Sequence, residues 1–557
     1  MGAIGTNVPR LDATEKAAGR ATYTVDLRLP GLLHGRFLRS PHPHARILHI
    51  DADRARRLPG VRAVVTGADA PAVRHGRVIK DETAFPTTRV RFVGERVAAV
   101  AAIDPDIAEE AVGLIRVEYE PLPPVHTPEE AMREGAPVLH EELASYVSEV
   151  KAERFGNVCA RFLTVQGAGA DGFAEADLVV EDSFTTHIAH QAYIEPHCVL
   201  AACEPSGRAT VWTNAQSPFD VRRVLAEVTG LPESQIRVVV PPIGGAFGGK
   251  LYLMDEPQAL LLALRAGKPV KLQMTYEDEF LAGYPRHPST IHLRTGVKAN
   301  GELVAREARI IVDSGAYAGY GPATAAQIAR WIIGPYRIPH TRVEASCVYT
   351  NKMNCGFYRG PGHTQAVFAC ETQIDRVATE LGQDPVEFRL RNLEENGPGA
   401  PDFRAILRRA AESWGWGKPL PRRTLGRGIA VSHRGSGGRP ASAWVRLNND
   451  GTATMYTGTV DLTGSNVALA QVVAEELGLP THRVAVVSGD TDATPFDSGT
   501  NASRVTFVTG GTVRQAAAQV RRRLLELAAE SLEASVDDLE LQDGAVQVKG
   551  TPSRRAS

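Results

Sequence analysis

A repeated order of predicted elements constrains the fold of this chain more than any other feature of its sequence. A predicted strand at 211–214 leads through a loop into a helix at 220–228, which stops at Gly-Leu-Pro before a strand at 236–240. The same order returns from 452 to 487, with Gly-Leu-Pro at 478–480. Glycine and proline after a helix are an ordinary stop signal, so only the repetition of the whole order is informative. It predicts two related α/β domains that face each other.

The length of the chain and its turn signals suggest how the domains follow one another. The 557 residues suffice for about three or four domains. Short β-rich runs begin at residue 20, and the alternating strand at 116–120 ends at Pro-Leu-Pro-Pro. We therefore expect a first domain over 1–125, a linker over 126–170, a first α/β domain over 171–400 and a second over 401–557.

Outside the repeat, the pattern predicts further elements. The stretch 268–318 is β-rich, and the stretches 365–381 and 385–392 are helical. A last helix covers 511–531, where three consecutive arginines indicate a solvated face. We expect the tail at 550–557 to be disordered.

Charge and cysteine content exclude several classes of function. Lys and Arg total 62 and Asp and Glu total 64, so a net charge of −2 gives no electrostatic reason to bind nucleic acid or an anionic membrane. No apolar run approaches the roughly 20 residues of a membrane-spanning helix, and the N-terminus lacks the pattern of a secretory signal. The 6 cysteines form no CxxC pair, so zinc-ribbon and iron–sulfur spacings are absent. Scattered thiols favour a reducing, cytoplasmic location.

The segment Pro-Pro-Ile-Gly-Gly-Ala-Phe-Gly-Gly-Lys at 241–250 follows an apolar strand and is the sharpest candidate site. Four glycines in six positions let backbone N–H groups approach a bulky ligand without interference from Cβ atoms. Successive N–H donors suit an oxo or phosphate group. The loop is not a Walker A motif, because the spacing differs and Leu251 stands where Ser or Thr is required. A flexible glycine turn is the structural alternative.

Other polar segments are weaker candidates. Arg359 lies among small, turn-forming residues, where it either reaches an anionic group or is a plain surface arginine. Glu195 precedes a proline and is held extended, and we expect it to be an exposed turn carboxylate. Hydroxyl and amide side chains at 489–492 and 498–503 follow a strand and suit either a polar ligand or a solvent loop.

Two attractive patterns carry little weight. Pro-His-Pro-His at 41–44 looks like a metal-binding tract, but the prolines keep the two imidazoles off a common helical face. A Gly-x-Ser-x-Gly motif in a strand–helix setting is absent, so the sequence gives no support to a serine hydrolase.

Taken in order, these segments resemble the molybdopterin-binding large subunit of the molybdenum hydroxylases, the family of xanthine dehydrogenase, aldehyde oxidase and carbon monoxide dehydrogenase. The similarity covers almost the whole chain, and includes the opening at 12–46, Gln-Ala-Tyr-Ile-Glu-Pro at 191–196 and Gly-Asp-Thr at 489–491. The resemblance implies an α+β fold with an N-terminal hammerhead-like α/β domain, followed by two related α/β molybdopterin-binding domains, the second incomplete.

The resemblance also implies which residues meet the cofactor. Gln216 matches a glutamine beside the molybdenum's oxo ligand, Phe247 matches the wall of the metal site, and Arg359 matches an arginine at the cofactor. These three are the implied catalytic residues, and no protein side chain ligates the molybdenum, because the pterin's dithiolene does. The implied cofactor-binding residues are Gln216, Gly245, Ala246, Phe247, Gly248, Arg359, Thr500, Ala502 and Ser503, the last three in a loop that holds the pterin phosphate.

The implied activity is hydroxylation of an aldehyde or aromatic heterocycle with oxygen derived from water. In the family a metal-bound hydroxide attacks an electrophilic carbon, hydride passes to a sulfido ligand and two electrons leave. The implied cofactor is molybdenum–molybdopterin, either as such or as the cytosine dinucleotide. Since this chain lacks iron–sulfur cysteine spacings, the electrons are expected to pass to partner subunits that carry [2Fe-2S] clusters and FAD.

The chain departs from the family pattern in four places. The family's Gly-Gln-Gly loop appears as Val-Asp-Leu-Thr-Gly-Ser at 460–465, without a glutamine. Gly360 follows Arg359 where copper-containing carbon monoxide dehydrogenases carry a cysteine, which argues against carbon monoxide. Leu251 stands where purine-oxidising members have a glutamate, which favours aldehydes or aromatic heterocycles. The Gly-Glu motif with the general-base glutamate is not found, so we expect either a separate chain that supplies the C-terminal region or a truncated, non-catalytic cofactor-binding or assembly subunit.

Overall fold

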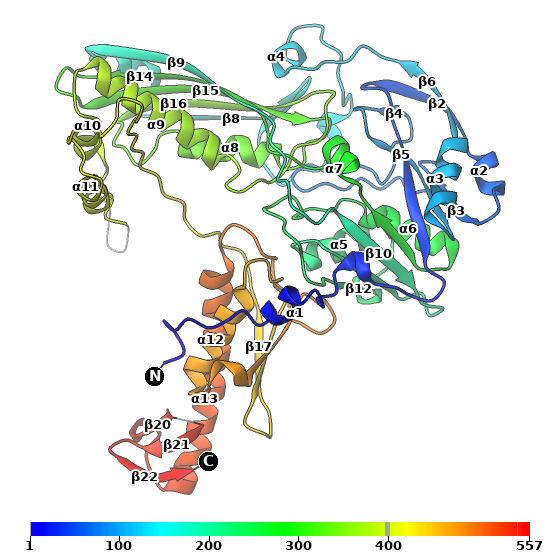
Figure 1. Cartoon of the computed structure of the whole chain (residues 1–557). Helices are drawn as coiled ribbons and strands as arrows, with labels where there is room; N and C mark the ends of the chain where they lie inside the picture. The colour runs from blue at the N-terminus through cyan, green and yellow to red at the C-terminus, as the bar shows by residue number, and fades with distance from the viewer. Residues whose placement is uncertain (1, 396–400, 543, 557) are drawn as a thin grey trace.

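A computed structural model describes residues 2–395, 401–542 and 544–556 of the chain. Helices and sheets are mixed throughout, which confirms the expected α+β architecture (Figure 1). The N-terminal region contributes helices α1 (Ala13–Ala17), α2 (Asp53–Arg57), α3 (Pro105–Leu114) and α4 (Pro128–Ala131), and strands β1 (Leu33–Arg39), β2 (Ala45–Asp51), β3 (Val61–Thr66), β4 (Arg89–Val90), β5 (Arg96–Ala102) and β6 (Arg116–Pro121).

A seven-stranded sheet joins this region to the part of the chain that follows. Its order is β12-β11-β10-β13-β1-β5-β3, where the new strands are β10 (Cys198–Cys203), β11 (Ala209–Thr213), β12 (Ile236–Val239) and β13 (Val270–Gln273). The parallel pairing of β1 with β13 places Leu33 opposite Val270. Helices α5 (Pro218–Thr229) and α6 (Glu256–Ala266) bury apolar side chains in the same core as the strands. The N-terminal region therefore shares a core with the first half of the repeat.

A six-stranded sheet holds the largest core. Its order is β7-β8-β16-β15-β14-β9, with β7 (Glu153–Phe155), β8 (Val158–Gln166), β9 (Leu178–Thr186), β14 (Ser289–Val297), β15 (Leu303–Gly315) and β16 (His340–Tyr349). Helices α8 (Gly321–Trp331) and α9 (His363–Glu380) lie along one face, and α10 (Pro385–Asn392) lies beside α9 (Figure 1). Helix α7 (Tyr276–Ala282) precedes β14.

The expectation of a linker over 126–170 is wrong for much of that segment. It supplies α4, β7 and the nine-residue strand β8, which pairs antiparallel with β16 from Val158 to Gln166. Val158, Cys159 and Ala160 are almost fully buried. Pairing with a distant neighbour satisfies the backbone of β8, and local sequence patterns do not report such pairing.

The C-terminal part forms a separate layer around a short sheet. Its elements are α11 (Phe403–Ser413), β17 (Ala443–Leu447), β18 (Ala453–Thr457), α12 (Ser465–Leu477), β19 (Val484–Ser488), α13 (Gly510–Leu532), β20 (Leu539–Gln542), β21 (Ala545–Val548) and β22 (Thr551–Ala556). A small sheet, β20-β21-β22, lies at the far end of α13 (Figure 1). The expected disorder at 550–557 is wrong for the described residues, because β22 pairs with β21 while Leu539 and Val546 pack against α13.

The structure confirms the repeat and extends it by one strand. Strand β10 pairs antiparallel with β11, and β11 leads through α5 into the parallel strand β12. Strands β17, β18 and β19 repeat this ββαβ order around α12. Gly230 and Gly478 end the two helices with φ angles of 75° and 61°, which glycine adopts without steric strain.

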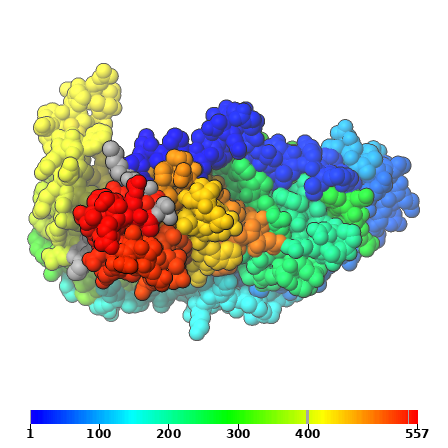
Figure 2. Space-filling model, turned by 90° about the horizontal axis from the view of Figure 1, so that it is seen from below, coloured from blue at the N-terminus to red at the C-terminus, as the bar shows by residue number. Residues whose placement is uncertain are grey.

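The N-terminal segment reaches across to the second half of the repeat. Figure 2 shows it, in dark blue, running beside the yellow and orange residues of the C-terminal part. The side chain of Gln471 on α12 donates to the carbonyl of Ala3 at 2.8 Å. Among the described residues, no helix combines the length and the apolar character needed to cross a membrane.

Candidate functional site

The two ββαβ units meet at the carboxyl ends of their parallel strands. The backbone N–H of Val240 donates to the carbonyl of Gly489 at 2.8 Å, and that of Thr491 donates to the carbonyl of Val238 at 3.0 Å. The loops that follow β12 and β19 therefore lie together. In open α/β sheets this edge is where ligands bind. We call residues 241–250 the glycine loop, 498–503 the hydroxyl loop and 356–363 the arginine loop.

Gln216 connects two of these loops with its side-chain amide. Its Nε2 donates to the carbonyl of Thr500 at 2.7 Å, and its Oε1 accepts from the N–H of Gly248 at 3.0 Å. The N–H of Thr500 also donates to the carbonyl of Gln216 at 3.0 Å. Gln216 is buried. The structure thus brings three of the predicted residues together across the two halves of the repeat.

The glycine loop presents free backbone donors. The N–H groups of Gly245, Ala246 and Phe247 have no acceptor in the described part of the chain. Gly248 has a φ of +103°, and a Cβ there would lie 3.0 Å from Cβ of Phe357. A glycine is therefore required at this position. Phe247 has a φ of +51° and leaves its ring half exposed.

The hydroxyl loop repeats this arrangement on the other side. The N–H groups of Asn501, Ala502 and Ser503 also lack an acceptor within the described ranges. Thr500 Oγ1 donates to the carbonyl of Val460 at 2.7 Å, which fixes the loop against the turn after β18. Two sets of three successive N–H donors, one from each half, suit oxo or phosphate oxygens.

Backbone strain concentrates at this site. Seven described residues other than glycine have a positive φ, and six of them lie in these loops or in segments that contact them. Such conformations cost about 1–3 kcal/mol each and persist where surrounding structure enforces them, often for function. The six residues are Ala192, Phe247, Arg359, Arg439, Ala502 and Ser503.

The backbone of Arg359 is held by hydrogen bonds, whereas its side chain has no partner among the described residues. Its N–H donates to the carbonyl of Phe247 at 2.9 Å, and its carbonyl accepts from Nη2 of Arg286 at 3.1 Å. Its exposed guanidinium forms no hydrogen bond or ion pair with another described residue. An unpaired guanidinium beside free N–H donors fits an anionic ligand.

The expectation that Glu195 is an exposed turn carboxylate is wrong. Its side chain is only 10% exposed, and its Oε2 lies 2.8 Å from Nζ of the fully buried Lys250. The same oxygen accepts from the N–H of Gly244 at 2.8 Å. Burial lowers the pKa of Lys250 more than Glu195 raises it. Glu195 thereby contacts both Gly244 and Lys250 of the glycine loop. A lysine in this loop needs a partner of opposite charge if it is buried, and this was the one sequence signal that pointed to Glu195.

A second buried carboxylate supports the loop from behind. Glu279 on α7 accepts from the hydroxyl of Tyr193 at 2.6 Å and lies 2.9 Å from Nδ1 of His197. Burial alone would raise the pKa of Glu279, but His197, His190 and Tyr193 lower it well below its usual range. No local sequence pattern indicated this cluster, because it joins residues about eighty positions apart.

The residues at two family departures have structural roles. Asp461 stands in the segment without the glutamine, and its Oδ1 accepts from the N–H groups of Gly464 and Ser465 at 2.7 and 2.9 Å. It therefore caps the start of α12. Leu251 is only 4% exposed, and its N–H donates to the carbonyl of Gly248. It lies behind the glycine loop.

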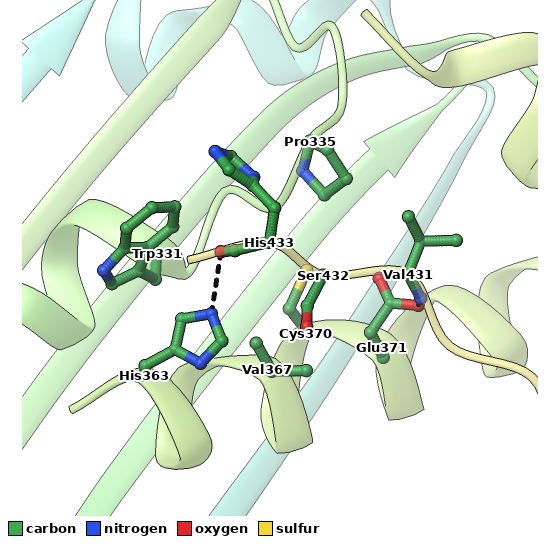
Figure 3. A pocket seen from close by; sticks show the side chains of 10 residues that line it. Trp331, Pro335, His363, Val367, Cys370, Glu371, Val431, Ser432 and His433 are labelled. Atoms are coloured by element: carbon green, nitrogen blue, oxygen red, sulfur yellow. Dashed lines mark hydrogen bonds between the residues drawn. The ribbon is translucent and has the colours of Figure 1, made fainter. Parts of the chain in front are cut away.

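A strap at 429–440 runs from α9 to the hydroxyl loop. At its start the N–H of Val431 donates to Oε2 of Glu371 at 2.8 Å, and His363 Nε2 lies 2.9 Å from the carbonyl of His433 (Figure 3). At its end the N–H of Gly437 donates to the carbonyl of Ala502 at 2.8 Å. A Cβ on Gly437 would lie 2.6 Å from Cβ of Ala502, so only glycine permits this approach. The strap couples the six-stranded sheet to the site.

The site offers backbone and amide donors in place of metal ligands. Within the described residues, no group of three or more His, Cys, Asp or Glu side chains is arranged to hold a metal ion. His44, from the demoted tract, is buried with its Nδ1 2.9 Å from the carbonyl of Pro123.

Comparison with protein families matches the chain in three consecutive segments. Residues 18–123 match the "aldehyde oxidase and xanthine dehydrogenase, a/b hammerhead domain". Residues 150–393 and 404–557 each match a "molybdopterin cofactor-binding domain". The two cofactor-binding matches contain the two ββαβ units.

Individual relatives agree with these families. The chain is 35% identical to a probable xanthine dehydrogenase subunit from Bacillus subtilis, over 95% of this chain and 72% of that protein. It is 36% identical to the nicotinate dehydrogenase large molybdopterin subunit of Eubacterium barkeri, over 71% of this chain and 90% of that protein. Among solved structures, quinoline 2-oxidoreductase from Pseudomonas putida 86 superposes with a TM-score of 0.87 at 32% identity, covering 100% of this chain and 75% of that one.

Proposed function

The chain belongs to the molybdenum hydroxylase family as a molybdopterin-binding large subunit, and from that premise we propose that the glycine, hydroxyl and arginine loops hold its cofactor. The observation that carries the proposal is the pair of facing loops with three unpartnered N–H donors each, tied together by Gln216. When bound, molybdenum–molybdopterin supplies the family's two-electron hydroxylation chemistry.

The residues fit such a group by their donor chemistry. We assign the N–H groups of Gly245, Ala246 and Phe247 to oxygen atoms at the metal end, and those of Ala502 and Ser503, with Thr500, to the phosphate end. Gln216 keeps one side-chain N–H free, because only one of the two is used on Thr500. We assign Arg359, whose guanidinium is unpaired, to an anionic part of the cofactor, either molybdopterin itself or its cytosine dinucleotide form.

The proposed substrate is an aromatic nitrogen heterocycle or an aldehyde. The half-exposed ring of Phe247 offers an apolar plate beside the proposed metal end, which suits a flat, weakly polar molecule. Leu251 supplies no carboxylate for a purine. The names of two similar proteins, a nicotinate dehydrogenase and a quinoline 2-oxidoreductase, support the heterocycle.

Carboxylates near the loops are committed to other partners. Glu195 is paired with Lys250, Asp461 caps α12, and Asp497 is paired with the fully buried Arg504 at 2.6 Å. None of the three is free to act as the general base. We propose that a glutamate from outside the described residues supplies that function. The second candidate, a cofactor-holding or assembly subunit without turnover, is favoured by the same three pairings.

Electron acceptors are proposed to be partner subunits. Several relatives carry names of subunits in larger complexes, including a gamma subunit of a dehydrogenase complex. We propose a [2Fe-2S] subunit and an FAD subunit as partners, in the cytoplasm, where the thiols of this chain stay reduced.

Metal and pterin analysis tests the cofactor proposal, and an assay tests turnover. The full chain, co-produced with its companion subunits, should contain molybdenum and pterin and should oxidise an N-heterocycle or aldehyde with an artificial electron acceptor. Bound cofactor without turnover of either substrate class would favour the assembly role. Absence of both molybdenum and pterin would overturn the proposal for the loops.

A further inference from the structure

A polar cavity of about 40 Å³ lies between the N-terminal region and the first cofactor-binding domain, and none of the three loops described above lines it. His75 and Glu82 face it from the connection between β3 and β4, where their backbones pair through hydrogen bonds of 2.8 and 3.0 Å. Arg96 on β5, Gln258 on α6 and Asn354 after β16 also line it. Thr83, Glu95, Tyr284 and Tyr317 add further polar groups to the lining. The space is sufficient for about three water molecules.

Several buried polar atoms around this cavity lack partners. Glu82 Oε1, Gln258 Oε1, Asn354 Oδ1, His75 Nε2 and Arg96 Nη2 are inaccessible to solvent and form no hydrogen bond with described residues. Glu82 is 8% exposed, and Gln258 and His75 are each 5% exposed. An unsatisfied buried polar group costs about 1–3 kcal/mol, so five around one polar cavity indicate internal water.

Glu82 forms no ion pair with another described residue. Its Oε2 receives only the hydroxyl of Tyr284, at 3.4 Å, while Arg96 is paired with Asp255 at 2.6 Å. The adjacent carboxylate, Asp81, accepts from the N–H of Ala318 and the hydroxyl of Tyr349, each at 2.7 Å, and its Oδ1 is unpartnered.

The surrounding charges compensate this pair only in part, through Arg91 near Asp81 and Arg96 near Glu82. Glu95, which adds a like charge, is bound by the hydroxyl of Tyr317 and the N–H of Arg91, and Arg77 is paired with Asp220. Burial and the charge of Asp81 raise the pKa of Glu82 to about 8, and burial raises that of Asp81 to about 6. Two neighbouring buried carboxyls of this kind do not both ionise.

We propose that this cavity is a hydrated proton-holding site, in which Glu82 holds one exchangeable proton and shares it with internal water molecules. The exchange makes and breaks only O–H bonds. Neutral Glu82 then donates into the cavity, and the waters satisfy Gln258, Asn354, His75 and Arg96.

The site adjoins the back of the glycine loop. A second space of about 10 Å³, room for about one water, is lined by Gly248, Gly249, Tyr252 and Tyr284. Tyr284 borders both spaces, and the hydroxyl of Tyr252 lies 3.2 Å from Nδ1 of His75. These hydroxyls link the proton-holding site to the loop, and its use as a proton store during turnover rests on the proposed function.

Infrared spectroscopy of the full chain tests the site without reference to activity or cofactor content. At neutral pH the unmodified protein should show a protonated carboxyl band that shifts in D₂O. Glu82→Gln, which preserves the shape of the side chain, should remove this band. Glu118→Gln, an exposed glutamate on β6, should leave it unchanged. A spectrum without a protonated carboxyl band, or a band that survives Glu82→Gln, would overturn the proposal.

A high-resolution crystal structure provides the second test, and it remains informative if Glu82→Gln does not fold. Ordered waters should lie within hydrogen-bond distance of Glu82 Oε1 and Gln258 Oε1. Gln258→Leu should displace at least one of them. A dry cavity in the unmodified protein would overturn the proposal. Neither test measures molybdenum or turnover. Failure of the proton-holding site is therefore distinguishable from failure of the proposed function.

Discussion

The side-chain amide of Gln216 donates to the backbone carbonyl of Thr500 across 2.7 Å, and so joins the two halves of an internal repeat. The two residues are 284 positions apart. The same amide accepts from the glycine loop through the N–H of Gly248. One side chain therefore sets the spacing of both rows of free N–H donors, and changes to it should act on the whole site.

Gln216→Ala should weaken cofactor retention and the protein itself. The substitution leaves the carbonyl of Thr500 and the N–H of Gly248 without their buried partners, at a cost of about 1–3 kcal/mol. Urea denaturation should show this loss, and purified protein should contain less molybdenum. Gln235→Ala, an exposed glutamine before β12, should change neither. Equal molybdenum content in the two variants would contradict the assigned role of Gln216.

Gly248→Ala should destabilise the glycine loop. The residue has a φ of +103°, and the added Cβ would lie 3.0 Å from Cβ of Phe357, so strain of about 1–3 kcal/mol is expected. Gly113→Ala is the matched control, because a Cβ there meets nothing within 4 Å in α3. Alanine in a helix should stabilise by about 0.5–1 kcal/mol. Thermal unfolding of the two variants should therefore shift in opposite directions.

Glu195→Gln should lower the free energy of unfolding strongly, although it replaces only a carboxylate by an amide of the same shape. It leaves the ammonium of Lys250 fully buried without its counter-charge, which typically costs about 3–5 kcal/mol. Lys250→Met in the same chain should recover much of the loss, because both charges are then absent. A double-mutant cycle by denaturant unfolding measures this coupling. Additive effects of the two substitutions would contradict the ion pair.

Acid should loosen the contact between the two repeat units through Asp490. Burial alone would raise the pKa of Asp490, but the ion pair with Arg237 and the N–H groups of Asp492 and Ala493 together outweigh it, so the pKa lies below the ordinary value of 3.8. A lowered pKa in the folded state means that the pair stabilises the protein above 3.8 and that this contribution is lost as the pH falls below it. Asp490→Asn should flatten this part of the pH–stability curve. An unchanged curve would show that the pair contributes nothing.

Much of the fold was predictable because it depends on local signals. Helices α5 and α12 were expected because each has an apolar face and ends at Gly-Leu-Pro, and glycine adopts the left-handed conformation needed there. Strand β8 was missed because its partner β16 lies far away in the sequence. Strand β22 was missed because its residues are mostly exposed and only pairing with β21 orders them.

In the site, too, local signals were predictable from the sequence and contacts between distant residues were not. The glycines at 244–249 predicted a loop whose backbone N–H groups approach a ligand, and this stays a prediction. In the structure the backbone of Gly248 lies close to Phe357. The burial of Glu195 was not expected, because a carboxylate before a proline is usually exposed and its partner Lys250 lies 55 residues away. The N–H donors of the hydroxyl loop depend on positive φ angles at Ala502 and Ser503, which sequence alone does not favour.

Molybdenum and pterin content per chain is the measurement that tests the central claim most directly. The full chain, purified with its companion subunits, should carry about one molybdenum and one pterin. Arg359→Ala should lower both, because the unpaired guanidinium is assigned to the cofactor, whereas Arg133→Ala, an exposed arginine after α4, should not. Protein that is folded and assembled but contains neither molybdenum nor pterin would contradict the account.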